Sequence, residues 1–247
     1  MIDPFFLPRM YRVADPPEPA ANWALFLDLD GTLIDIAQTP DAVEVPDGLI
    51  KRLADASRAL GGALAIASGR LLAEIDQLLA PLKLPAAGEH GAVIRLPDGV
   101  YDELDCKVPY DWVETFLAAS TQMPGVLIER KAHSVVAHYR RAPKFLDELR
   151  QIAVRLVSLE PASFEILEAK MAIELRPRTV TKARAVNRLM QCEPFKGRLP
   201  VFVGDDLTDH DGFKAVEAMG GLAVDVFQRF AGRPQEVRDW LKQVARV

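Results

Sequence analysis

The stretch ALFLDLDGTLID, residues 24–35, closes an apolar run with two aspartates and a glycine. A continuous apolar run of this kind is typical of a strand that is covered on both faces, as in a parallel sheet. Side-chain direction repeats every two residues along a strand, so we expect Asp28 and Asp30 to point roughly the same way. Two carboxylates so placed would repel each other, which raises one pKa or calls for a cation. Gly31 would permit the sharp turn that follows.

Apolar runs and segments of helical period alternate toward both ends of the chain. This order predicts a Rossmann-like α/β core, in which helices flank a parallel sheet. Strands are expected within 23–29, 61–70, 199–206 and 221–226, and helices within 46–60, 71–82, 181–191, 209–219 and 234–245.

The middle of the chain has a different pattern. Strands are expected at close spacing in 125–131, 133–141, 164–170 and 171–177, with a helix in 143–157. Polar residues alternate with apolar ones in several of them, so one face of this second sheet should be open to solvent or to a ligand. The sequence therefore predicts a small α+β domain at 108–176, inserted between the core segments 1–107 and 177–247.

Polar clusters stand where strands of the core are expected to end. They are Asp28 to Thr32, Ser68-Gly69-Arg70, and Gly204-Asp205-Asp206 with Asp209 nearby. Ligands of open parallel sheets bind beyond the carboxyl ends of the strands, so these distant segments should meet. Asp28, Asp30 and Asp205 around one point would suit a hard cation, and Mg²⁺ is the usual occupant when a phosphate is also bound. The alternative for any single aspartate is that it caps the next helix.

The same segments resemble the motifs of a known superfamily. DLDGTL (28–33), SGR (68–70), Lys182 and GDDLTD (204–209) look like the four motifs of the haloacid dehalogenase phosphatases, in the right order. GEHGAVIR (88–95), the ERK and HYR segments of the middle strands, and GDDLTDHDGF (204–213) narrow the resemblance to trehalose-6-phosphate phosphatases, from about residue 24 to 225. It implies a core of the haloacid dehalogenase type with an inserted cap domain that sets substrate specificity.

The resemblance also implies a role for each motif residue. Asp28 would be the nucleophile that forms an aspartyl-phosphate, and Asp30 the general acid and then general base. Mg²⁺ would be held by Asp28, the backbone carbonyl of Asp30, and Asp205. Ser68 and Lys182 would bind the transferring phosphoryl oxygens. Supporting positions would be Gly31, Thr32, Arg70, and Asp206 and Asp209, which would support the metal shell or orient Lys182.

Simpler explanations exist for some of these residues. Ser68 could cap the helix expected near Leu71, and Lys182 could be an exposed surface lysine. Asp206 and Asp209 could simply stabilise the N-terminus of the helix expected after them, because carboxylates interact favourably with the positive end of a helix dipole.

Acids and bases share faces of the middle strands, which suits a sugar because carboxylates accept hydroxyl hydrogens while Lys and Arg donate to hydroxyl oxygens. By resemblance, Glu129, Lys131, Arg140 and Glu168 would contact the sugar, and Lys170 would accompany Glu168. His138 shares its face with Arg140, and the loop with Gly88, Glu89 and His90 would lie near the site. A solvated surface is the alternative for each charged pair, and ordinary structural roles are the alternative for both histidines.

The function expected is Mg²⁺-dependent hydrolysis of trehalose 6-phosphate to trehalose and phosphate, in trehalose biosynthesis. Alternatives are a phosphatase of sucrose, mannosylglycerate or hexose phosphate, and a non-catalytic sugar-phosphate sensor.

The net charge of −5 disfavours nucleic acid or an anionic membrane as partner. The N-terminal residues lack a signal-peptide pattern and no apolar run reaches membrane-span length. Cys106 and Cys192 have no metal or redox spacing and are expected to be buried free thiols, so a cytoplasmic location is predicted. Oligomeric state and any synthase partner stay open.

Overall fold

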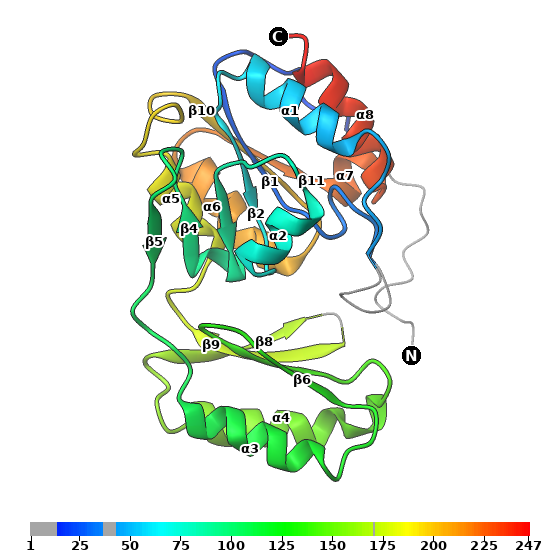
Figure 1. Ribbon diagram of the computed structural model, residues 1–247, viewed down its shortest axis with the longest axis vertical. Helices are drawn as coiled ribbons and strands as arrows, with labels where there is room; N and C mark the ends of the chain where they lie inside the picture. The colour runs from blue at the N-terminus through cyan, green and yellow to red at the C-terminus, as the bar shows by residue number, and fades with distance from the viewer. Residues whose placement is uncertain (1–13, 37–42, 170) are drawn as a thin grey trace. The chain divides into compact units, whose positions relative to one another are not determined.

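The computed structural model describes residues 14–36, 43–169 and 171–247 (Figure 1). Most of the expected N-terminal lead-in, and Lys170, lie outside these residues. The chain divides into two compact units, one formed by the residues up to Asp102 with Thr181–Val247, and one by Glu103–Val180. The sequence placed the corresponding boundaries at 107/108 and 176/177, a few residues inside those of the structure.

The first unit is built on a seven-stranded sheet in the order β11-β10-β1-β2-β3-β4-β5. Neighbouring strands from β11 to β3 pair in parallel, and β4 is antiparallel to β3. The predicted α/β class is therefore confirmed. The strands are β1 Trp23–Leu27, β2 Leu64–Ala67, β3 Ala86–Gly88, β4 Val93–Arg95, β5 Tyr101–Glu103, β10 Leu199–Gly204 and β11 Leu222–Asp225.

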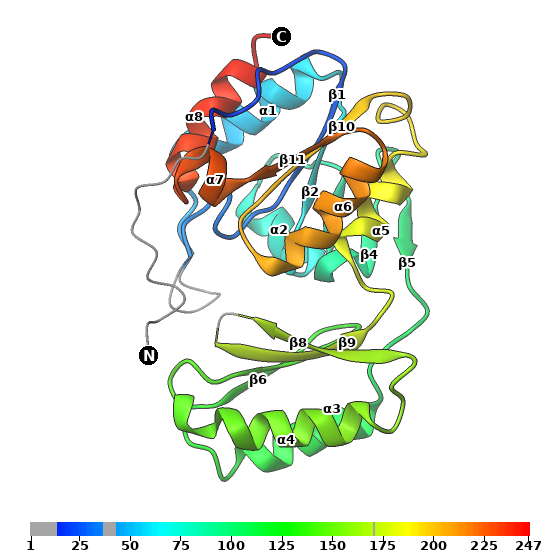
Figure 2. The same cartoon turned by 180° about the vertical axis from the view of Figure 1, so that it is seen from behind.

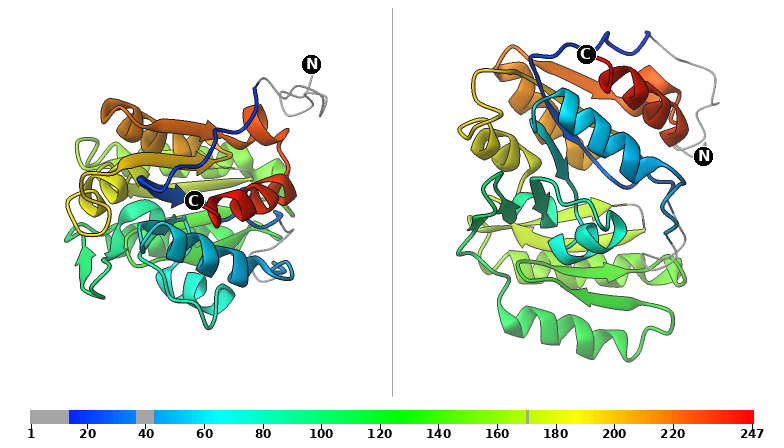
Figure 3. Two further views of the ribbon diagram at one scale, coloured as in Figure 1. Left: turned by 90° about the horizontal axis from the view of Figure 1, so that it is seen from above. Right: turned by 45° about the horizontal axis from the view of Figure 1, so that its top comes forward.

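Helices cover both faces of this sheet, which explains why every residue of β1 and β2 is buried. Helices α1 and α8 pack together on one face (Figure 1), and α5 and α6 pack together on the other (Figure 2). Figure 3 shows the same layering from above. The elements are α1 Leu49–Ala59, α2 Leu72–Leu78, α5 Lys182–Leu189, α6 His210–Ala218, α7 Val226–Phe230 and α8 Pro234–Val244, with short 3₁₀ turns η2 Glu89–Gly91 and η4 Leu207–Asp209.

The strand register brings three of the polar clusters to one edge of the sheet. Strand β1 lies between β10 and β2, and its last residue, Leu27, is opposite Val203 on one side and Ile66 on the other. The strands are parallel, so the chain leaves all three at the same edge. The segments that begin at Asp28, Ser68 and Asp205 therefore meet there, as the sequence predicted.

The second unit has a four-stranded antiparallel sheet in the order β6-β7-β9-β8. Helix α4 was predicted, whereas α3 was not. Both helices lie on one face of the sheet (Figure 1). Their apolar side chains, among them Trp112 and Phe116 of α3, form a separate core with the sheet. The elements are α3 Tyr110–Ser120, β6 Leu127–Arg130, β7 Val135–His138, η3 Pro143–Phe145, α4 Leu146–Val157, β8 Phe164–Ala169 and β9 Ala172–Pro177.

Two further sequence expectations concern exposure. Cys106 and Cys192 are free, but both are only partly buried, so the prediction of buried thiols is wrong. Cys192 remains reachable because it follows the last turn of α5, where its sulfur contacts the Arg188 side chain. Among the described residues, no helix combines the length and the apolar character needed to cross a membrane.

Candidate active site

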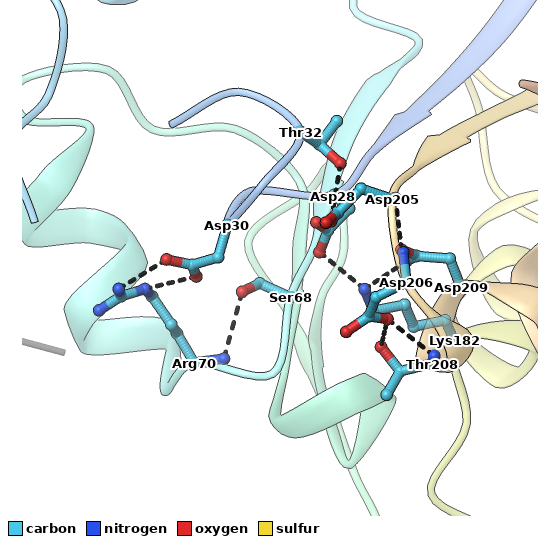
Figure 4. Close-up of polar contacts among 10 residues, drawn as sticks. All are labelled: Asp28, Asp30, Thr32, Ser68, Arg70, Lys182, Asp205, Asp206, Thr208 and Asp209. Atoms are coloured by element: carbon cyan, nitrogen blue, oxygen red, sulfur yellow. Dashed lines mark hydrogen bonds and ion pairs between the residues drawn. The ribbon is translucent and has the colours of Figure 1, made fainter. Parts of the chain in front are cut away.

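A buried lysine joins two aspartates at the carboxyl edge of the core sheet (Figure 4). The Nζ atom of Lys182 donates to Asp28 Oδ1 at 2.7 Å and to Asp209 Oδ1 at 2.5 Å. All three side chains are buried. Asp28 follows β1, Asp209 ends η4, and Lys182 is the first residue of α5, whose N-cap is Thr181. Lys182 is therefore no exposed surface lysine.

Asp209 also fixes the loop that follows β10. Its Oδ2 accepts the backbone N–H groups of Asp205 at 2.9 Å and Asp206 at 3.0 Å. Asp206 Oδ1 accepts the backbone N–H of Thr208 at 2.7 Å and its hydroxyl at 2.6 Å. Both aspartates thus cap η4, and Asp209 at the same time holds the ammonium of Lys182 in place.

The charges in this cluster perturb one another. Burial raises the pKa of Asp28 well above its usual value, Lys182 opposes this rise, and the carboxylates of Asp209, Asp205 and Asp206 add to it. Burial would lower the pKa of Lys182, but Asp209 and Asp28 reverse this and raise it. The neighbouring carboxylates therefore favour the charged form of Lys182 and disfavour ionisation of Asp28.

Two features of the structure require a glycine at position 31: the backbone conformation there and the closeness of Asp205. The φ of Gly31, +87°, lies in the left-handed region, and a Cβ atom there would stand 2.3 Å from Asp205 Oδ2. Any other residue would be strained and would push Asp205 away. The hydroxyl of Thr32 donates to Asp205 Oδ1 at 3.5 Å. The turn after Asp30 therefore packs directly against the third predicted metal ligand.

Asp30 does not share the direction of Asp28, and this expectation of the sequence is wrong. Its carboxylate forms a two-fold ion pair with Arg70, Nε to Oδ2 and Nη2 to Oδ1 both at 2.7 Å. Figure 4 shows Asp30 turned toward Arg70, apart from the contacts around Lys182. The reason is local: β1 ends at Leu27, and Gly31 donates its N–H to Ile34 O at 2.8 Å in a tight turn, so the alternation of an extended strand no longer applies.

Ser68 and the 88–91 loop lie together beside this cluster. The Ser68 hydroxyl oxygen accepts the backbone N–H of Arg70 at 3.2 Å, and the Ser68 carbonyl accepts the N–H of His90 at 2.9 Å. Helix α2 starts after Leu71, whose backbone N–H donates to Glu74 Oε2 at 3.0 Å. The alternative that Ser68 caps this helix is therefore wrong. His90 also packs on Gly69, where a Cβ atom would come within 2.6 Å of the imidazole.

The donor set at this edge suits a divalent cation. Asp28, Asp205 and Asp209 each offer an oxygen, and these atoms lie within 4.8 Å of one another. Carboxylate oxygens are the ligands preferred by hard cations. Asp206 adds a fourth carboxyl group near Asp28 and Lys182. The described residues of the cluster thus carry more negative charge than Lys182 neutralises, which a bound cation would offset.

Comparison with known proteins gives the family of this chain. The model of a family described as trehalose-phosphatase matches residues 26–244. The chain belongs to the trehalose-phosphatase family. It is 43% identical over 206 residues to a Sinorhizobium fredii protein named "Probable trehalose-phosphate phosphatase", covering 83% of this chain and 78% of that protein. It is 36% identical to trehalose-6-phosphate phosphatase of Escherichia coli K12, covering 94% and 90% of the two chains.

A solved structure, the C-terminal domain of C. albicans trehalose-6-phosphate phosphatase, has the same fold with a TM-score of 0.73 at 24% identity, covering 90% of this chain and 92% of that one. The trehalose-phosphatase match spans both the core unit and the inserted unit. The predicted resemblance to this family and to its fold is confirmed.

The inserted unit of this trehalose-phosphatase family member carries charged side chains on one face of its sheet. Val135 and Ile173 point into the core with α3 and α4, so residues one position away along each strand point to the other face. There, Glu129 Oε2 lies 2.7 Å from His138 Nε2. Burial alone would raise the pKa of Glu129, but the hydrogen bond with His138 and the charge of Lys131 lower it.

A second pair on this face was not predicted. Lys131 Nζ lies 3.6 Å from Glu174 Oε1, and both side chains are buried. The Ser134 hydroxyl donates to the same Glu174 oxygen at 2.5 Å. A signal was present in the sequence: Glu174 interrupts the apolar run of AIELRP, in register with Arg176 rather than with the core residues Ile173 and Leu175.

Glu168 lies on the opposite face of the sheet. It is four residues after Phe164, which belongs to the core with α3 and α4, and it forms a two-fold ion pair with Arg150 of α4 at 2.8 and 3.0 Å. Its hydrogen bond with Arg150 lowers its pKa. Glu168 therefore does not join Glu129, Lys131 and Glu174.

The remaining predicted substrate residues lie outside the strands of this sheet. Arg140 follows His138 by two positions, just beyond β7. Gly88 and Glu89 belong to the core unit, where they are buried beside the Ser68 loop.

Proposed function

We propose that this protein is a Mg²⁺-dependent phosphatase that hydrolyses trehalose 6-phosphate to trehalose and phosphate. Membership of the trehalose-phosphatase family supports the substrate. The observation that carries the chemistry is the buried contact between Lys182 and Asp28, next to the carboxylate of Asp205. This contact supports the proposal, because an oxygen of the proposed nucleophile, a cationic hydrogen-bond donor and carboxylates that could hold a cation lie close together.

In the first step an Asp28 carboxylate oxygen attacks phosphorus and the bond from phosphorus to the sugar oxygen breaks. Asp30 enters this step in its acid form and donates its proton to the departing oxygen, which leaves as the trehalose hydroxyl. Asp30 is then the carboxylate that pairs with Arg70. In the second step water attacks the phosphorus of the aspartyl-phosphate, Asp30 accepts a proton from that water, and phosphate leaves with Asp28 restored. Ser68 and Lys182 donate hydrogen bonds to the phosphoryl oxygens in both steps.

Asp28, Asp205 and the backbone carbonyl of Asp30 would hold Mg²⁺. The cation would reduce repulsion between the Asp28 carboxylate and the phosphate dianion. We assign Asp209 a supporting role, because its oxygens already accept hydrogen bonds from Lys182 and from the amides of Asp205 and Asp206. Asp206 has the same role, since it caps η4.

For the sugar we propose the charged face of the inserted unit, with Glu129, Lys131, His138 and Arg140, and we replace Glu168 by Glu174. Carboxylates accept hydroxyl hydrogens while Lys and Arg donate to hydroxyl oxygens, so the mixed signs on this face suit a polyhydroxyl substrate. Within the core unit, the loop of Gly88, Glu89 and His90 packs on the Ser68 turn and would also contact the substrate. A cytoplasmic location and the absence of a nucleic-acid partner stay predictions.

Phosphate release from a panel of substrates tests this proposal. We expect the highest kcat/KM for trehalose 6-phosphate, with sucrose 6-phosphate, mannosylglycerate phosphate and glucose 6-phosphate as competitors. A higher kcat/KM for a monosaccharide phosphate would contradict trehalose 6-phosphate as the substrate but would still agree with the proposed phosphatase mechanism. Binding of these esters without any phosphate release would instead favour the sensor hypothesis.

A further inference from the structure

We propose that Arg70 is a positioning residue for Asp30: its guanidinium fixes the orientation of the Asp30 carboxyl group and so sets the efficiency of proton transfer to the leaving oxygen. This inference rests on the proposed function, in which Asp30 is the acid and base. It gives a role to Arg70, the third residue of the SGR segment, which takes no direct part in the two proposed chemical steps.

The geometry of the pair is the first support. Two parallel hydrogen bonds, each of 2.7 Å, join the guanidinium to both Asp30 oxygens. One hydrogen bond would leave the carboxyl group free to rotate, whereas two fix its plane as well as its direction. The Arg70 side chain is 13% exposed and that of Asp30 34% exposed, so protein atoms shield most of the contact from water. A guanidinium also stays protonated throughout the pH range of an assay.

The anchoring of Arg70 is the second support. Its backbone N–H donates to the Ser68 hydroxyl oxygen at 3.2 Å, and its carbonyl accepts the N–H of Glu89 at 2.8 Å. The guanidinium therefore extends from a backbone that is tied to both neighbouring loops, and it can hold Asp30 at a fixed place relative to Ser68. Both contacts are made by backbone atoms, so Arg70→Met and Arg70→Lys keep the groups that form them.

Asp30 has a specific need for such a partner. It lies in a turn beyond the end of β1, and the acidic cluster around Asp28 would repel a further carboxylate. Proton transfer depends steeply on the placement of the donor. The competing role for Arg70 is direct contact with the phosphoryl group, which would act on substrate affinity and would not depend on Asp30.

The test compares Arg70→Met, Arg70→Lys, Asp30→Asn and the double variant Arg70→Met/Asp30→Asn. With trehalose 6-phosphate we expect Arg70→Met to lower kcat by about tenfold to a hundredfold, as misplaced catalytic groups do, with little change in KM. The kcat of Arg70→Lys should lie between those of Arg70→Met and wild type, because lysine keeps the positive charge but cannot form the two parallel hydrogen bonds of the guanidinium. The double variant should match Asp30→Asn, since Arg70 would act only through that carboxyl group.

A leaving-group comparison adds a second measurement. In the first turnover of p-nitrophenyl phosphate the leaving group needs no proton, so Arg70→Met should release nitrophenolate at nearly the wild-type rate. Arg95→Met is the matched control, because it removes another Arg–Asp pair of the core unit, with Asp76. This control should lower the melting temperature and leave the ratio of the two substrate rates unchanged.

Several results would overturn the role of Arg70. They are a further loss of kcat when Arg70→Met is added to Asp30→Asn, a rise in KM without a loss of kcat, and equal losses with both leaving groups. A crystal structure of Arg70→Met gives a measurement that does not need turnover: Asp30 should have left its present orientation, and an unchanged Asp30 contradicts the proposal. Wild-type protein that hydrolyses no sugar phosphate would count against the proposed function, while this structural comparison would still decide the role of Arg70.

Discussion

The Nζ atom of Lys182 lies 2.7 Å from Asp28 Oδ1, although 154 residues separate the two in the sequence. Both side chains are buried, so this contact exists only because the end of β1 and the start of α5 are packed against each other. The pair brings a permanent positive charge to the oxygen that we propose as nucleophile. A phosphoryl group bound here would lie beside both the Asp28 oxygen that attacks it and the Lys182 ammonium that donates a hydrogen bond to it.

Substitution of the nucleophile gives the first prediction. Asp28→Asn should abolish steady-state phosphate release, because an amide cannot form the aspartyl-phosphate. Folding should be retained, since the amide has the size of the carboxyl group and removes a charge that the cluster disfavours. Asp35→Asn, at an exposed position of the same segment, is the control and should keep wild-type activity. Substantial turnover by Asp28→Asn would falsify the covalent mechanism.

Removal of the cation gives the second prediction. Phosphate release should stop in EDTA and return when Mg²⁺ is added in excess. The excess of carboxylates around Lys182 should also make the protein more stable with the cation bound than without it. Thermal unfolding in EDTA and in Mg²⁺ measures this, and the melting temperature should be higher in Mg²⁺. Full turnover in EDTA would contradict the cation site.

Gly31 allows a comparison with a matched glycine. Gly31→Ala and Gly99→Ala both place a side chain at a positive φ, +87° and +84°, which costs about 1–2 kcal/mol of stability. At Gly99 nothing lies within 4 Å of the new Cβ, whereas at Gly31 it would meet Asp205. Both variants should lose stability in urea unfolding, but only Gly31→Ala should also lose kcat, by about a hundredfold if Asp205 moves by 1 Å. Equal kcat values for Gly31→Ala and Gly99→Ala would mean that catalysis does not depend on the present position of Asp205.

The two glutamates of the inserted sheet give a test of the sugar site. Glu174→Gln should lower kcat/KM for trehalose 6-phosphate by about tenfold or more, because a hydrogen bond to a charged group contributes about 1.5–3 kcal/mol. Its kcat/KM for p-nitrophenyl phosphate, which has no sugar, should stay unchanged. Glu168→Gln, on the helix-covered face, should leave both values unchanged. If Glu168→Gln has the larger effect on the sugar phosphate, the assignment of Glu174 is wrong.

The ion pair of Asp76 predicts a pH-dependent stability. Burial would raise the pKa of Asp76, but the hydrogen bond and charge of Arg95 lower it overall. A carboxyl group with a lowered pKa stabilises the folded state above its unfolded pKa and loses this effect as the pH falls through the folded pKa. Asp76→Asn should therefore lower the melting temperature at pH 7, and its difference from wild type should shrink in acid. Exposed Glu217→Gln is the control. A difference independent of pH would contradict the role of charge.

The sequence by itself determined the core fold and which of its segments meet at the carboxyl edge of the core sheet. The alternation of apolar runs with helical segments is a local property, so it predicted the parallel sheet, and with it the meeting of Asp28, Ser68 and Asp205 at one edge. Helix α3 was missed, because its segment has three buried residues in eleven and a weak apolar pattern.

Only the tertiary structure decided which side chains face one another. The reversal at Gly31 turns Asp30 to Arg70, 40 residues away, and no local pattern encodes that partner. Likewise, the packing of Phe164 on α3 and α4 decides that Glu168 lies on the covered face of its sheet and Glu174 on the other. Spacing along a strand fixes which residues share a face, but the choice between the two faces depends on what packs against the sheet, and that is a property of the folded chain.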